Sequence, residues 1–129
     1  MPFDWNQYLQ LAQEILNEVD SANPSLLDDA RLRCASSRAY YAAYWACRTY
    51  MERRHRVNFG KQGKHSELPL MLQNMTWNPA AVSVGINLAR IVPQRVAADY
   101  KTLAPFNHRN CQLLIRTADQ IIQDVQRVP

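Results

Sequence analysis

The stretch from residue 26 to residue 54 constrains the fold more than any other part of this chain. It contains neither glycine nor proline, and no glycine interrupts the chain before Gly60. Ser25 followed by Asp28 offers a helix start, because a serine with an acid three residues later can cap a first turn. We therefore expect one long central helix over residues 26–54.

The remaining chain shows helical periodicity and no alternation typical of β-strands. Four further helices are expected, over residues 5–20, 66–75, 79–103 and from 107 onwards, with a kink at Pro93. The chain has 129 residues, of which 47% are hydrophobic. This length and composition suffice for one buried core, but the chain is too short for two domains. These patterns predict an all-α, up-and-down bundle of four main helices plus one short helix, in a single domain covering residues 1–129.

Cysteine usage and hydropathy limit the classes of function. Cys34, Cys47 and Cys111 are odd in number, lack C-x-x-C spacing and lie within apolar helical patterns. They are typical of small buried side chains in a reducing compartment, so we expect neither a metal site nor a cofactor. No apolar run approaches the roughly 18 residues that span a bilayer, and no secretory pattern follows Met1. We expect a cytoplasmic protein without membrane contact.

Basic residues are concentrated in one segment. Residues 1–30 hold six acids and no lysine or arginine, whereas residues 31–66 hold nine basic side chains and one acid. The candidate nucleic-acid contacts in this segment are Arg53, Arg54, Arg56, Lys61 and Lys64. Such cations can follow phosphates by releasing counterions. They can equally be a solvated helix end, where cations interact favourably with the helix dipole.

A second candidate site depends on one carboxylate. Arg38 and Tyr41 lie on the long helix among alanines and aromatic residues that favour burial. A guanidinium that is covered by such residues requires a counter-ion. Between Glu67 and Asp119 only Asp99 supplies a carboxylate. We therefore expect Asp99 to pair with Arg38. Arg95 lies four residues before Asp99 on the same helical face, so two guanidiniums and one carboxylate could meet here. This polar centre is either a structural salt bridge or an arginine-lined site suited to phosphate.

Three motifs carry a resemblance to a known family. They are SRAYYAAYWACR at residues 37–48, GKHSEL at 63–68 and RVAADY at 95–100, in that order. In residues 25–127 the chain resembles small prokaryotic proteins of the HEPN superfamily. The resemblance implies a HEPN-like helical bundle, dimerisation through the later helices, and roles in defence or toxin–antitoxin systems. Many relatives are metal-independent ribonucleases, and others bind RNA or small nucleotidyltransferases.

The catalytic motif of that family is incomplete in this chain. The family's ribonucleases carry an arginine followed after four to six residues by a histidine. Here Arg95 is followed after four residues by Tyr100, and positions 101 and 102 hold no histidine either. A tyrosine is a poor general base at neutral pH, since its ordinary pKa is near 10. His65, just before the short helix, is the other candidate catalytic residue.

These observations predict a HEPN-like homodimer in a defence or toxin–antitoxin system, which binds RNA or a nucleotidyltransferase-type partner with a degenerate ribonuclease motif. Two alternatives stay open. The first is an active metal-independent endoribonuclease that uses His65 or Tyr100 with Arg95. The second is a non-catalytic protein-interaction scaffold, in which the polar centre only fixes the helix packing.

Overall fold

The computed structural model describes residues 3–61 and 63–129; residues 1, 2 and 62 of the predicted domain lie outside the described part. Its helices are α1 (Asn6–Asn17), α2 (Asp28–His55), α3 (Glu67–Gln73), α4 (Pro79–Tyr100) and α5 (His108–Arg127). No strand occurs among the described residues. The all-α bundle of four main helices and one short helix is therefore confirmed.

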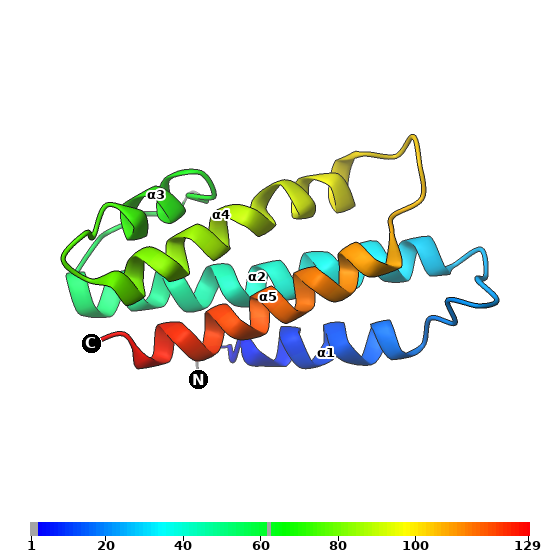
Figure 1. Ribbon diagram of the computed structural model, residues 1–129, viewed down its shortest axis with the longest axis horizontal. Coiled ribbons are helices and arrows are strands. Elements are labelled where there is room, and N and C mark those ends of the chain that lie inside the picture. The colour runs from blue at the N-terminus through cyan, green and yellow to red at the C-terminus, as the bar shows by residue number, and fades with distance from the viewer. Residues whose placement is uncertain (1–2, 62) are drawn as a thin grey trace.

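Helix α2 is the centre of the bundle, as its length predicts. It packs against α1, α4 and α5, and Figure 1 shows these four helices running side by side along the long axis of the molecule. Three alanines at helical spacing, Ala35, Ala39 and Ala42, are at most 1% exposed. Because alanine side chains are short, this ridge lets neighbouring helices approach the α2 backbone closely.

Helix α3 packs against the first half of α4 and lies at the end of the bundle where α2 ends (Figure 1). Gly85 permits this contact. A Cβ atom at this position would lie 2.8 Å from both the Leu72 Cβ and the carbonyl oxygen of Pro69. Only a residue without a side chain fits at this distance. Because α3 covers only the first half of α4, the second half of α4 can contribute to a site.

The two ends of α4 are fixed in different ways. Asn78 caps the start, with its side chain accepting a hydrogen bond from the Ala81 backbone amide at 3.3 Å. The helix ends at Tyr100, three residues before the expected end at Leu103. The reason is a tertiary contact: Arg33 of α2 donates to the backbone carbonyls at this end, which replaces a further helical turn.

Two of the three cysteines meet the expectation of burial. Cys47 and Cys111 are fully buried, and burial raises the pKa of both thiols. Cys34 is only half-buried. Within residues 3–61 and 63–129, no helix is both long and apolar enough to cross a membrane.

Candidate functional site

A buried arginine lies between α2 and the second half of α4. Arg95 is 7% exposed, and its Nη1 donates to Asp99 Oδ2 at 3.3 Å, one helical turn along α4. Its guanidinium carbon lies over the rings of Tyr40 at 5.2 Å and Tyr41 at 5.6 Å, and 6.0 Å from that of Tyr100. Tyr100 itself is 70% exposed. The guanidinium is thus enclosed by aromatic rings and paired with one carboxylate.

The predicted pairing of Arg38 with Asp99 is wrong. The carboxylate of Asp99 pairs with Arg95, four residues earlier on the same face of α4. Arg38 is half-buried and makes no ion pair with any described residue; its guanidinium lies 5.1 Å from the centre of the Tyr8 ring on α1. The reason is orientation, since Arg38 faces α1 and not α4. A cation–π contact therefore stabilises Arg38 in place of a carboxylate.

His65 joins the same group of rings. The hydroxyl of Tyr40 lies 2.7 Å from His65 Nδ1, and the imidazole lies 4.5 Å from the ring centre of Tyr44 and 5.7 Å from that of Tyr41. Burial, then the charges of Arg95 and a second arginine, lowers the pKa of His65. We call Arg95, Asp99, Tyr40, Tyr41 and His65 the Arg95 cluster.

The hydrogen bond to Tyr40 links the roles of the two ring nitrogens of His65. Tyr40 is completely buried, and burial raises the pKa of its phenol, so the hydroxyl keeps its proton. Its oxygen has no other hydrogen-bond partner in the described part of the chain, and which group donates in this bond depends on the tautomer of His65. When Tyr40 donates to Nδ1, the neutral imidazole carries its own proton on Nε2 and has no free lone pair. In the other tautomer Nδ1 donates to Tyr40, and Nε2 is free to accept a proton.

A second buried arginine, which the sequence analysis did not single out as a site residue, fixes the segment before His65. Arg48 is 6% exposed and donates to Tyr44 Oη at 3.1 Å and to the carbonyl oxygen of Gly60 at 2.7 Å. Tyr44 Oη in turn accepts from the backbone amide of Lys64 at 2.9 Å. The one sequence signal was Glu52, four residues after Arg48, which forms an ion pair with it at 3.2 Å.

The predicted basic segment is largely exposed. Arg53, Arg54, Arg56 and Lys61 are exposed, and none of them forms an ion pair with a described residue. Lys64 differs, because it is half-buried and lies 3.7 Å from a carboxylate oxygen of Glu67. Four of the five predicted cations are thus available to an anionic partner. The segment leads directly to His65.

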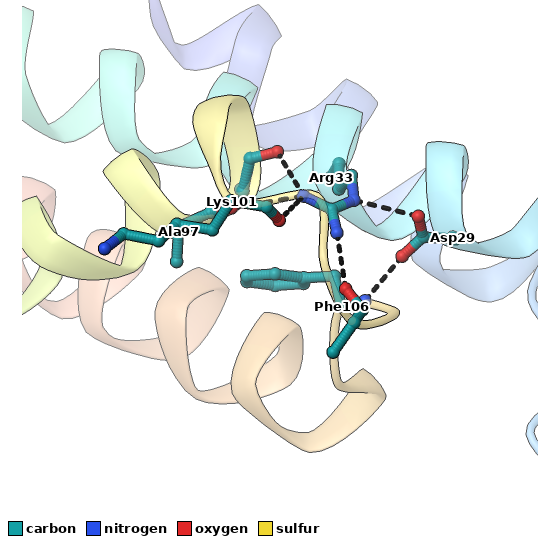
Figure 2. Close-up of polar contacts among 7 residues, drawn as sticks. Asp29, Arg33, Ala97, Lys101 and Phe106 are labelled. Atoms are coloured by element: carbon teal, nitrogen blue, oxygen red, sulfur yellow. Dashed lines mark hydrogen bonds and ion pairs between the residues drawn. The ribbon is translucent and has the colours of Figure 1, made fainter.

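A third arginine, also missed from the sequence, fixes the end of α4 (Figure 2). Arg33 donates from Nη1 to the carbonyl oxygens of Ala97, Ala98 and Lys101 at 3.1, 3.0 and 2.7 Å, and from Nη2 to that of Ala104 at 2.8 Å. Its Nε donates to Asp29 Oδ2 at 2.9 Å.

The carboxylate of Asp29 completes this arrangement. Its second oxygen accepts a hydrogen bond from the backbone amide of Phe106. That bond, followed by the contact with Arg33, lowers the pKa of Asp29. We call Asp29 and Arg33, with the five backbone groups that they bind, the Arg33 clamp. The only signal in the sequence was the four-residue spacing of the pair.

The chemistry available to the Arg95 cluster is recognition of anions and aromatic rings. Arg95 Nε is buried and has no hydrogen-bond partner among the described residues, and Nη1 has only Asp99. Within residues 3–61 and 63–129, no three His, Cys, Asp or Glu side chains lie close enough together to hold a metal ion. Fold and site define a helical bundle with a buried arginine surrounded by tyrosines and a neutral histidine. Comparisons with protein-family models, with curated proteins and with solved structures find no match for the chain.

Proposed function

We propose that this protein is a HEPN-like component of a prokaryotic defence or toxin–antitoxin system that binds RNA without cleaving it. One observation carries the proposal. The buried guanidinium of Arg95 has five N–H donors, and the described residues use only one of its nitrogens, in a 3.3 Å bond to Asp99. Unused donors on a planar guanidinium suit the oxygens of a phosphate.

The rings around Arg95 support a nucleic acid over a simple anion. Bases of single-stranded RNA stack on aromatic side chains, largely independently of sequence. Tyr41 is half-buried and Tyr100 is 70% exposed, and both rings lie within about 6 Å of the Arg95 guanidinium. A base stacked on either ring would bring its phosphate close to Arg95.

The exposed basic segment supports the same proposal. Arg53, Arg54, Arg56 and Lys61 lie outside the Arg95 cluster, on the stretch of chain that leads to His65. Unpaired cations on a surface attract the phosphate backbone and release its counterions. They would provide affinity, while the Arg95 cluster would define where the chain binds.

The geometry of His65 favours binding over cleavage. Cleavage by attack of the 2′-hydroxyl needs a side chain that accepts its proton. In the tautomer in which Tyr40 donates to His65 Nδ1, that lone pair is occupied and Nε2 carries a proton, so His65 cannot accept one. The exposed phenol of Tyr100 is no substitute, because tyrosine side chains are weak bases at neutral pH.

A homodimer is part of this proposal. The resemblance implies dimerisation through the later helices, and Ile86, Ala89 and Pro93 are exposed on one face of α4. Their spacing of three and four residues forms an apolar stripe that a second copy could cover. A small nucleotidyltransferase stays a proposed partner on the resemblance alone. Sedimentation equilibrium of the wild type and of Ile86→Glu tests the dimer.

The test of RNA binding is fluorescence anisotropy with a labelled single-stranded RNA over a range of salt concentrations. Replacing Arg54, Arg56 and Lys61 together by serine should reduce the slope of log K against log salt by about 2. A matched triple variant removes three exposed arginines of α5, Arg109, Arg116 and Arg127, and should leave the slope nearly unchanged. Equal slopes for both variants would remove the basic segment from the interface.

The test of catalysis uses the same RNA with a chelator and without added metal. We expect no cleavage by the wild type, whereas Tyr100→His places an imidazole next to Arg95 and should introduce slow cleavage. Cleavage by the wild type that is lost in Arg95→Ala or His65→Ala would establish the endoribonuclease instead. Absence of both binding and cleavage would favour the interaction scaffold.

A further inference from the structure

We propose that a groove between α4 and α5 binds an acidic amphipathic helix of a partner protein. Two adjoining hollows of about 470 and about 160 Å³ form this groove, and both are lined by Gln94 and Asn110. The larger hollow follows the α4–α5 connection, and the smaller one continues between the two helices. We call the two together the α4/α5 groove. Its combined size is within the range of sites that accept side chains or small ligands.

Exposed apolar side chains line the groove. Leu103 is fully exposed on the α4–α5 connection, Tyr100 is 70% exposed, and Leu113 on α5 is 46% exposed. A single exposed leucine is ordinary on a protein surface. Several around one groove are typical of a surface that a partner covers. In helix-in-groove recognition, apolar residues of the bound helix enter such hollows.

The connection that carries Leu103 has a fixed shape. The Arg33 clamp binds the carbonyl oxygens of Lys101 and Ala104, on either side of Leu103, and the backbone amide of Phe106 (Figure 2). A loop held by its backbone on both sides of an exposed leucine loses little conformational entropy when a partner binds. The leucine is thus preorganised for contact.

The charges of the groove indicate the chemistry of the partner. Arg90 and Lys101 line it, both are exposed, and neither forms an ion pair with a described residue. No aspartate or glutamate lines either hollow. An apolar groove with unpaired cations fits a helix that combines an apolar face with acidic side chains.

A protein helix fits this surface better than RNA does. Nucleic-acid surfaces that bind single strands present flat aromatic rings for base stacking, whereas Leu103 and Leu113 are aliphatic and cannot stack. Tyr100 is the one aromatic ring of the groove that also borders the Arg95 cluster. The remaining groove residues are separate from those of the RNA proposal, so the two proposals can fail independently.

The test uses a labelled synthetic peptide of about 18 residues, long enough for five helical turns. It carries leucine at positions i, i+3, i+4 and i+7 and glutamate on the other faces. A second peptide has lysine in place of each glutamate, and a third has serine in place of each leucine. By fluorescence anisotropy, the acidic peptide should bind at least about tenfold more tightly than either control peptide. Equal binding of the three peptides, or no binding of the acidic one, overturns the proposal.

Matched variants locate the binding. Leu103→Ser should weaken binding of the acidic peptide about tenfold, whereas Leu26→Ser, at another fully exposed leucine, should not change it. The double variant R90E/K101E should abolish binding, and the control R116E/R127E should retain most of it. Circular dichroism checks that each variant is folded. Groove variants that behave as their controls overturn the proposal.

Two other occupants would also overturn it. The first is RNA, which would lose affinity in Leu103→Ser and compete with the peptide. The second is a second copy of this chain, for which Leu103→Ser would convert a dimer into a monomer in sedimentation equilibrium. An unchanged oligomeric state and unchanged RNA affinity in Leu103→Ser, together with the loss of peptide binding, supports the acidic helix.

Discussion

Replacing Arg33 by alanine should destabilise the protein by about 2–3 kcal/mol, because this one side chain joins α2 to the end of α4 and to the α4–α5 connection. Arg33 has a 15% exposed side chain and reaches Asp29 and four backbone carbonyls. Three of these carbonyls contact Nη1, which has only two protons, so one of the three bonds is shared. The contacts therefore amount to about four full hydrogen bonds.

Not all of these bonds contribute equally. The carbonyls of Lys101 and Ala104 are bonded in exposed surroundings, so these two bonds hold the connection in place but add less to the free energy of unfolding than buried bonds do. The bonds to Ala97 and Ala98 are part-buried and should contribute about 1–1.5 kcal/mol together. The ion pair with the 42% exposed side chain of Asp29 adds up to about 1 kcal/mol. A cation at the end of α4 adds about 0.5 kcal/mol through the helix dipole.

Urea denaturation followed by far-UV circular dichroism measures this loss. The control is Arg116→Ala, which removes an exposed arginine of α5 that forms neither an ion pair nor a hydrogen bond with any described residue, and which should change stability by less than about 0.5 kcal/mol. Arg33→Lys keeps the charge but cannot reach all partners, so we expect an intermediate loss of about 1–2 kcal/mol. A loss in Arg33→Ala no larger than that in Arg116→Ala would refute the assigned role.

Three further variants test the packing and the Arg95 cluster. Gly85→Ala should cost about 1–3 kcal/mol in chemical denaturation, because the added Cβ lies 2.8 Å from the Cβ of Leu72; an unchanged midpoint would show that α3 can shift. The pKa of His65 is lowered in the folded protein, so below about pH 6.5 the unfolded chain binds a proton that the folded chain does not. The free energy of unfolding should therefore fall as the pH drops below that value, and His65→Gln should remove this part of the dependence; equal pH profiles for the two proteins would contradict the shift. Asp99→Asn should lower the free energy of unfolding by about 1–2 kcal/mol. This loss lies between those expected for an exposed and for a buried ion pair, because the side chain of Asp99 is 26% exposed and that of Arg95 is 9% exposed. No measurable loss would show that Arg95 needs no counter-ion.

The sequence by itself determined the helices and their order. Helical periodicity depends on local spacing, so it can be read along the chain. Caps were read less well, because Asn78 caps α4 but no side chain caps α2, where Ser25 was expected to do so. The predicted central helix over residues 26–54 corresponds to Asp28–His55. The burial of Ala35, Ala39 and Ala42 also follows from their spacing, whereas Ala46, which continues that spacing, is only half-buried. Sequence also indicated which residue types the site would contain, because Asp99 is the one carboxylate in a long stretch.

Only the tertiary structure decided which charged groups meet. Sequence allowed Asp99 to pair with either arginine, and the rotation of α2 about its axis turns Arg38 towards Tyr8 and leaves Asp99 to Arg95. The hydrogen bond between Tyr40 and His65 joins residues 25 positions apart, and Arg33 binds carbonyls more than 60 positions away. Backbone carbonyls are identical in every residue, so no sequence pattern marks them as partners. The physical reason is that helix periodicity is a local property, whereas the pairing of buried polar groups depends on how the packed helices are rotated against one another.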